Sequence, residues 1–221
     1  MMKTFNELQE GVYDPNIFKA FFLAGGPGSG KSYVVRKTTG GTGLKVVNSD
    51  NAFEKLLKDA NLSLKMPEDE TDARTPVRDR AKEITKKQQA NYLEGRLGLI
   101  IDGTGKDYDK ISNQSNELRQ LGYDTHLIFV NTSLDVALER NAKRSRSVPE
   151  SVVIKSWKSV QANIGKFNNH FKQNLIIVDN NEADEDIIKQ VYKRIQGLLK
   201  KKVKNTRAKS WIEMELARKK R

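Results

Sequence analysis

The sequence predicts a three-layer α/β domain built on a mostly parallel β-sheet of about five strands. Short runs of almost continuous apolar residues recur along the chain, at 19–24, 44–48, 97–102, 125–130 and 174–179. Such runs are typical of strands that helices cover on both faces. Helical patterns stand between the runs, and a helix that connects two strands of one sheet makes them parallel through a right-handed crossover.

Several segments between and after these runs have the apolar spacing of helices. Ser133, directly before LDVALERN, is a good N-cap because its hydroxyl can accept a backbone N–H of the first turn. Pro149 suits the first turn of the next helix, where no partner for a backbone N–H is needed. The expected helices are 30–39, 51–60, 76–94, 107–121, 134–143, 149–163 and 183–199.

Length and composition exclude several classes of protein. The chain has 221 residues, which suits one sizeable domain with an appendage. It has no cysteine, so it has no disulfide, no thiolate nucleophile and no zinc–thiolate site. No apolar stretch approaches the roughly 20 residues that cross a bilayer, and the N-terminus lacks the apolar core of a secretory signal. We therefore expect a cytoplasmic protein without membrane contact.

The positive charge is concentrated at the C-terminus. The formal net charge is +12, from 40 Lys and Arg residues against 28 Asp and Glu residues. Residues 189–221 hold 13 of the basic residues and 2 of the acidic ones, and the rest of the chain is nearly neutral, with 27 basic and 26 acidic residues. We expect an N-terminal extension at 1–17, a domain at 18–199, and a solvated basic tail with some helix at 200–221. Such a tail suits contact with nucleic acid or an acidic protein.

Residues 25–32, GGPGSGKS, match the phosphate-binding pattern G-x-x-x-x-G-K-[ST] between an expected strand and an expected helix. The glycines allow the backbone to turn so that several N–H groups point at a phosphate, and the following helix adds its positive end. Lys31 would neutralise the β- and γ-phosphates, and the Ser32 hydroxyl would ligate Mg²⁺. We therefore expect ATP and Mg²⁺ as cofactors. The expected nucleotide-binding residues are Gly25, Gly26, Gly28, Ser29, Gly30, Lys31 and Ser32.

Two aspartates follow expected strands and so belong to the same end of the sheet, where ligands bind. Asp50, in VVNSDN, can accept the proton of a hydroxyl held near the γ-phosphate, or it can cap a helix that starts at Asn51. Asp102, in LGLIIDGTGKD, can bind Mg²⁺ or cap the Gly-Thr-Gly turn that follows it. Thr104, in that turn, is a candidate for substrate contact.

The segment ALERNAKRSRSVPE, at 137–150, has the features of a lid. Arg140 and Arg144 lie one helical turn apart on one face, and Arg146 follows them. A guanidinium that reaches over a triphosphate stabilises the charge that builds up on the transferred group. The alternative is a solvated basic helix end that faces the dipole of its own helix.

The stretch at 68–80 is first acidic and then basic, which is typical of an insertion or a mobile segment near the cleft. Arg74 and Arg78 in this stretch are, with Thr104 and Arg146, candidates for contact with substrate. The two histidines suit a strand and a surface position, so no histidine metal cluster or catalytic triad is expected. The chain has neither the N-K-x-D guanine reader nor an ABC-type signature, which disfavours a GTPase switch and a transporter ATPase.

Four segments occur in an order that is typical of small kinases: GGPGSGKS, NSD at 48–50, IDGTG at 101–105 and ERNAKRSRSVPE at 139–150. The set resembles the P-loop kinase group that includes polynucleotide 5′-hydroxyl kinases and zeta-toxin-type kinases, over about residues 18–180. The lid, R-N-x-K-R followed by V-P, is most similar to that of phage-type polynucleotide kinases. The resemblance implies a phage or bacterial origin, and the host cytoplasm as location if the protein is phage-encoded.

This resemblance implies a role for each residue that matches a family motif. Asp50 would be the general base that accepts the hydroxyl proton. The other implied roles are phosphate clamp for Lys31, lid arginines for Arg140 and Arg144, and Mg²⁺ ligands for Ser32 and Asp102. The chain departs from the polynucleotide kinases beside the base, where Ser49 and Asn51 stand in place of a basic residue and a second acid.

The sequence leaves three functions open. The lid and the basic tail favour a kinase that acts on a nucleic-acid hydroxyl. The neutral body and the altered surroundings of Asp50 favour a zeta-type kinase of a nucleotide-sugar or another small metabolite. A protein of a different class would bind ATP without catalysis and dock on nucleic acid or an acidic partner through its tail.

Overall fold

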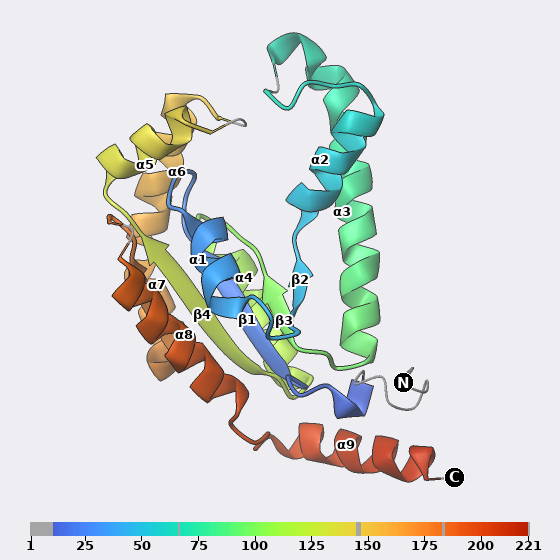
Figure 1. The fold of residues 1–221 in the computed structure, drawn as a ribbon. Helices are drawn as coiled ribbons and strands as arrows, with labels where there is room; N and C mark the ends of the chain where they lie inside the picture. Colours follow the sequence, from blue (N-terminus) through green and yellow to red (C-terminus); the bar gives the residue numbers. More distant parts are fainter. Residues whose placement is uncertain (1–10, 66, 145–146, 183, 221) are drawn as a thin grey trace, which may run out of the picture.

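A computed structural model describes residues 11–65, 67–144, 147–182 and 184–220. Its centre is a five-stranded sheet with the order β2-β3-β1-β4-β5, in which every neighbouring pair is parallel (Figure 1). The predicted α/β class and all the predicted strands are therefore confirmed. The strands are β1 (Lys19–Ala24), β2 (Lys45–Val47), β3 (Leu99–Ile101), β4 (Asp124–Asn131) and β5 (Leu175–Asp179).

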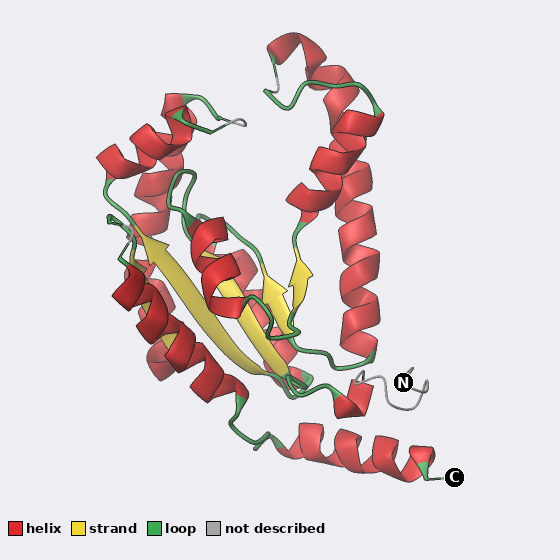
Figure 2. Ribbon diagram, viewed as in Figure 1, coloured by secondary structure: helices red, strands yellow, loops and turns green. Residues whose placement is uncertain are grey.

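Helices cover both faces of this sheet (Figure 2). The α-helices are α1 (Lys31–Thr39), α2 (Ser49–Asp59), α3 (Thr71–Glu94), α4 (Tyr108–Gln120), α5 (Leu134–Ala142), α6 (Glu150–Ala162), α7 (Ile164–Phe171), α8 (Glu185–Leu199) and α9 (Thr206–Lys219). Short 3-10 turns are η2 (Gly11–Tyr13), η3 (Glu68–Glu70) and η4 (Lys172–Asn174).

The core has two layers because the strands alternate their side chains between two helical faces. In β1, Phe22 packs with residues of α4, α6, α7 and α9, whereas Phe21 and Leu23 pack with residues of α1 and α8. Every residue of β1 is buried, which explains its unbroken apolar sequence. The strand that leads to the GGPGSGKS loop is therefore enclosed in the core, at the centre of the sheet.

Helices α2 and α3 form a separate projecting pair, seen in Figure 1 at the upper right. They share their own small apolar cluster, with Phe53, Leu57 and Ala81 at its centre. Helix α3 begins at Thr71, not at the predicted Pro76, which lies inside the helix. A proline near the start of a helix breaks few backbone bonds, because the first N–H groups have no helical acceptor. Residues 71–80, within the stretch predicted as an insertion or mobile segment, are helical, and that prediction stays a prediction.

The C-terminal segment is not a solvated tail. Helix α9 packs under the sheet, where Ala208 is fully buried and the Trp211 ring meets Phe18 edge-on at 5.5 Å. Arg207 also donates a hydrogen bond of 2.9 Å to the carbonyl of Gln120. The sequence prediction of a solvated tail was based on the many basic residues in this segment and did not anticipate that its few apolar residues pack on the domain. The division of the chain at 17 and 199 stays a prediction.

The two histidines are parts of the core and its edge. His126 in β4 is buried and stacks on Phe21 with ring centroids 4.9 Å apart, and its burial lowers its pKa to about 4. His170 in α7 contacts Ser115 and Phe171, and its partial burial lowers its pKa. Among the described residues, no three metal-ligating side chains of His, Cys, Asp or Glu gather at one place, and no helix is long and apolar enough to cross a membrane.

Candidate active site

The GGPGSGKS loop, residues 25–32 and called the P-loop below, lies between β1 and α1. Gly30 is the N-cap of α1 and has a left-handed backbone, with φ 78°. The backbone N–H of Gly25 donates to the carbonyl of Thr104 at 2.9 Å, and the side chain of Asn180 donates to the carbonyl of Ser29 at 2.8 Å. The P-loop is therefore attached to the loops that follow β3 and β5.

Glycine is required at Gly28 for two independent reasons. Its φ of 79° is unfavourable for any residue with a Cβ atom. A Cβ atom there would also lie 1.9 Å from the carbonyl oxygen of Ala137 in α5. The backbone of α5 thus rests directly on the P-loop, so the helix that begins the predicted lid lies beside this loop.

A chain of contacts joins the P-loop to both predicted aspartates. The Lys31 ammonium forms an ion pair with one carboxylate oxygen of Asp102, and both side chains are 14% exposed. The other carboxylate oxygen accepts a hydrogen bond of 2.7 Å from the side-chain amide of Asn48. The amide oxygen of Asn48 in turn accepts the backbone N–H of Asp50 at 2.7 Å.

This last bond makes Asn48 the N-cap of α2. The alternative that Asp50 caps the helix is wrong, because the helix begins at Ser49 and Asp50 lies in its first turn. The N-cap residue of α2 is therefore Asn48 and not Asp50. Asp50 lines the same cavity as the P-loop.

The cavity has a volume of about 430 Å³ and gathers residues from four separate regions of the sequence. Besides the P-loop, its walls come from the start of α2, the loop after β3 and the end of α5. The predicted site residues in its lining are Gly25, Gly26, Gly28, Ser29, Gly30, Lys31, Ser32, Asp50, Asp102, Thr104, Arg140 and Arg144.

The two arginines predicted to belong to a lid, Arg140 and Arg144, differ in their contacts. The guanidinium of Arg140 donates to the backbone carbonyls of Asn180 and Asn181, at 2.6 and 3.0 Å. Arg140 thus supports the loop whose Asn180 side chain holds the P-loop. Arg144 follows the end of α5, and its exposed side chain lines the cavity. Of the two residues, Arg144 is exposed and Arg140 is half-buried.

Two further residues predicted to contact substrate, Arg74 and Arg78, are not in the cavity lining. Arg74 donates to the carbonyl of Pro67 and to the hydroxyl of Thr71, at 2.6 and 3.0 Å, within its own helix end. Arg78 lies over the ring of Phe53, 4.6 Å from its centroid. Both belong to the projecting α2–α3 pair. Arg146 lies outside the described residues.

Asn48 and Glu54 are among the cavity residues that the sequence reasoning did not name as site residues. Glu54 lies one helical turn after Asp50, so the i, i+4 spacing on a helix that starts at Ser49 was a usable signal. Asn48 stands two residues before Asp50 at a strand end, where asparagine is a favoured N-cap. Its contact with Asp102 had no signal in the sequence.

The oxygen donors along this cavity fit Mg²⁺. Magnesium in phosphate sites keeps several waters and takes only one or two protein ligands besides the phosphates. The Ser32 hydroxyl and the Asp102 carboxylate are oxygen donors of this kind, and both line the cavity. The hydroxyl of Ser29 is buried without a hydrogen-bond partner among the described residues, as expected of a loop built around a missing polar ligand.

Comparison with known proteins identifies the family. The profile of the Zeta toxin family matches residues 9–193, a range that includes every residue of the cavity. No curated protein sequence matches the chain.

Several solved structures share the fold. A protein from Chloroflexus aurantiacus assigned as a kinase has a TM-score of 0.56 and 16% identity, over 81% of this chain and 97% of that one. The Pnkp1/Rnl/Hen1 RNA repair complex has a TM-score of 0.53 and 20% identity, over 69% of this chain and 47% of that one. The AvrRxo1-ORF1:-ORF2 complex with ATP has a TM-score of 0.56 and 15% identity, over 79% of this chain and 63% of that one.

Proposed function

The chain belongs to the Zeta toxin family, and on this premise we propose that it is an ATP-dependent kinase that transfers the γ-phosphate to a hydroxyl group. One observation carries the proposal. A phosphate-binding loop, a carboxylate in the first turn of α2 and an exposed arginine after α5 line a single cavity. A scaffold that only bound ATP would not need the second and third of these groups.

In the proposed reaction, the acceptor oxygen bonds to the γ-phosphorus while the bond from that phosphorus to the β–γ bridging oxygen breaks. The products are ADP and the phosphorylated acceptor. Asp50 takes the proton from the acceptor hydroxyl and so raises the nucleophilicity of its oxygen. Lys31 neutralises the β- and γ-phosphate oxygens, and Arg144 stabilises the negative charge on the transferred group.

Other residues position these groups. Arg140 holds the loop at Asn180 and Asn181, which in turn holds the carbonyl of Ser29 in the P-loop. Ser32 and Asp102 would hold Mg²⁺, which would neutralise negative charge on the phosphates.

The chemistry of the cavity wall favours a small, hydroxyl-rich acceptor. The side chains that surround Asp50 in the lining are the amides of Asn48 and Asn51 and the carboxylate of Glu54. Amides and carboxylates bind sugar hydroxyls well. The sugar hydroxyls of a nucleotide-sugar or a related metabolite therefore suit this wall.

A phosphate-transfer screen tests the proposal. Radiolabelled ATP is incubated with the full chain and with nucleotide-sugars, nucleotides, free sugars or 5′-hydroxyl oligonucleotides, and Asp50→Asn is run beside the wild type. We expect label transfer to a small hydroxylated acceptor, and its loss in Asp50→Asn. Transfer to oligonucleotides alone would refute the acceptor class. ATP binding without transfer to any acceptor would refute the kinase and favour the non-catalytic alternative.

A further inference from the structure

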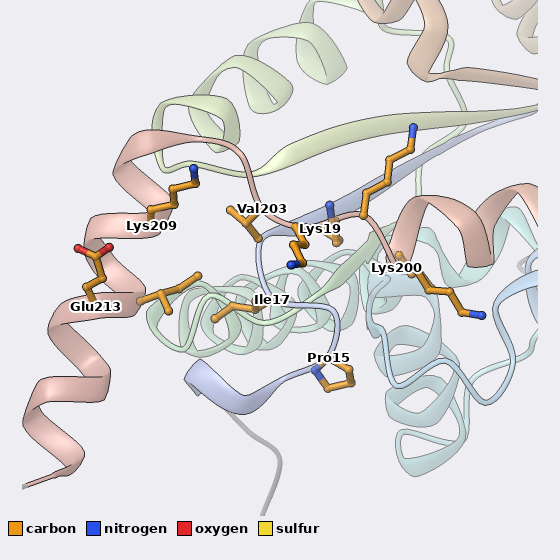
Figure 3. Close-up of a pocket in the computed structure, with 11 residues that line it drawn as sticks. Pro15, Ile17, Lys19, Lys200, Val203, Lys209 and Glu213 are labelled. Carbon is orange, nitrogen blue, oxygen red and sulfur yellow. The ribbon is translucent and has the colours of Figure 1, made fainter.

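A second cavity lies at the opposite end of the sheet from the P-loop. It has a volume of about 410 Å³ and lies where β1 begins, beneath the segment that connects α8 to α9 (Figure 3). Lys19 starts β1 and Ala24 ends it, so at about 3.3 Å per residue the strand separates the two cavities by roughly 16 Å. A ligand in the second cavity therefore does not occupy the kinase site.

Lysines and apolar side chains make up nearly all of the lining of this cavity. Figure 3 shows Lys209 and Glu213 of α9 on one side, Lys200 on the other, and Val203 and Ile17 between them. The lysines in the lining are Lys19, Lys200, Lys201, Lys202 and Lys209. They come from β1, from the end of α8 with the segment after it, and from α9. The lining contains a single carboxylate, that of Glu213.

The protein itself leaves most of this positive charge uncompensated. Lys19 is buried and forms an ion pair of 2.5 Å with Asp124. The other four lysines are exposed, and none of them forms an ion pair with another residue that the structure describes. Like charges that are held together without counter-ions attract anions from solution.

The charge is held on a folded surface and not on a loose tail. Ala208 of α9 packs closely against Gly122. A Cβ atom added at Gly122 would lie 2.9 Å from the Cβ atom of Ala208. Trp211 lies on Phe18, and Arg96 lies over the Trp211 ring at 5.8 Å. The lysine at 209 is thus fixed relative to those at 200–202.

The row of cations continues past the cavity. A neighbouring open depression of about 740 Å³ is lined by Arg119, Lys204 and Arg207, together with the amides of Asn116, Gln120 and Asn205 and the hydroxyl of Thr206. No acidic side chain lines it. Basic groups spaced along one segment, with neutral hydrogen-bonding groups between them, suit a ligand whose negative charges also repeat along a chain.

We propose that the surface formed by Lys200, Lys201, Lys202 and Lys209 is a nucleic-acid binding site that contacts the phosphate backbone independently of base sequence. The lining of the cavity contains no aromatic side chain on which bases could stack. Affinity at this site comes from neutralisation of phosphates and release of their counter-ions, so it depends steeply on salt. The site is separate from the kinase cavity, and the proposal does not depend on the identity of the phosphate acceptor.

The test is the binding of a short fluorescein-labelled DNA duplex to the full chain, followed by anisotropy as the salt concentration is raised. The variant replaces Lys200, Lys201, Lys202 and Lys209 by Gln. The matched control replaces four exposed lysines on other faces, Lys55, Lys86, Lys87 and Lys155, by Gln and so removes the same charge. At about 100 mM salt we expect the variant to bind tenfold or more weakly, with a log–log salt slope reduced by about 3, and the control to change by less than about threefold.

Two further variants show whether the duplex binds at the lysine surface or elsewhere on the protein. Glu213→Gln removes the single acid of the cavity, so we expect it to tighten binding severalfold, which misfolding cannot mimic. Lys31→Ala alters the kinase cavity and should leave duplex binding unchanged.

Three results would overturn the proposal. The first is equal loss of binding in the variant and the matched control, which would indicate an effect of net charge only. The second is loss of binding in Lys31→Ala alone, which would place the duplex in the kinase cavity. The third is displacement of the duplex by polyglutamate at equal concentration of charge, which would indicate an acidic protein as the partner.

Discussion

The side chain of Asn48 donates a hydrogen bond of 2.7 Å to the carboxylate of Asp102 while its own oxygen caps α2. This contact connects two loops that are 54 residues apart in the sequence. It exists because β2 and β3 are parallel neighbours with Val47 opposite Ile101, so that the next residue of each strand reaches the same place. Asn48 therefore couples the position of Asp50 to that of Asp102.

Replacement of Asn48 by Ser should separate the two functions of Asn48, which are the capping of α2 and the hydrogen bond to Asp102. Serine caps a helix as well as asparagine does, but it has no amide to donate to Asp102. We expect a melting temperature close to that of the wild type and a kcat about 10- to 100-fold lower, as for residues that orient metal ligands. Asn113→Ser, at an exposed position of α4, is the control. Equal activity of Asn48→Ser and the wild type would show that Asn48 is only a cap.

Asp50→Asn should abolish most of the phosphate transfer without unfolding the site. The hydrogen bond from its backbone N–H to Asn48 does not involve the carboxylate, so the substitution keeps this bond. Loss of a general base costs about 10²- to 10⁴-fold in rate, so we expect kcat to fall by that factor while ATP still binds. Calorimetric titration with ATP and label transfer to the acceptor measure the two effects. Full transfer activity in Asp50→Asn would show that another group takes the proton.

The pair Gly28→Ala and Gly41→Ala should distinguish steric exclusion from backbone strain. The two glycines have nearly the same φ, 79° and 76°, but a Cβ atom at Gly41 meets nothing within 4 Å. Gly41→Ala should therefore lose only about 1 kcal/mol of stability. Gly28→Ala must also push α5 away from the P-loop, so we expect loss of ATP binding. Equal behaviour of the two variants in urea unfolding and nucleotide titration would show that the contact with α5 does not matter.

His126 should make the fold less stable in mild acid. Its burial lowers its pKa to about 4 in the folded protein, against about 6.5 when unfolded. The unfolded chain therefore binds this proton first as the pH falls, and stability is lost between about pH 6.5 and 4, with about 2 kcal/mol gone at pH 5. Urea unfolding at pH 7 and pH 5 measures the loss, which His126→Phe should reduce. An unchanged pH dependence in that variant would assign the effect to other groups.

Trp211→Ala should show that α9 is part of the folded domain. The indole packs on Phe18, so we expect a loss of about 2 to 3 kcal/mol, somewhat less than for a fully buried tryptophan. Met214 lies on the same helix with 55% of its side chain exposed, and Met214→Ala should change stability by less than about 0.5 kcal/mol. Chemical unfolding compares the two. If both variants were as stable as the wild type, α9 would not contribute to the core.

Local sequence patterns were sufficient to predict most of the fold. The apolar runs located all the strands, and the position of GGPGSGKS between a strand and a helix located the P-loop. Helix α9 was not predicted as part of the core because its Ala208 and Trp211 stand among many lysines. That these two residues pack in the cluster that contains Phe18 is visible only in the tertiary structure. The start of α3 was misplaced because a proline is a weak stop signal near a helix N-terminus.

The sequence by itself determined the elements, the P-loop and the separate charge of the C-terminus, because strand runs, glycine patterns and charge are properties of neighbouring residues. Only the tertiary structure decided what these elements touch. The bridge from Asn48 to Asp102 follows from the register of β2 and β3, and the support of the P-loop by Asn180 follows from the meeting of parallel strand ends. The fixed lysine surface likewise depends on α9 folding back onto β1. Contacts between residues far apart in a chain depend on packing geometry, and a local pattern of residue types does not encode that geometry.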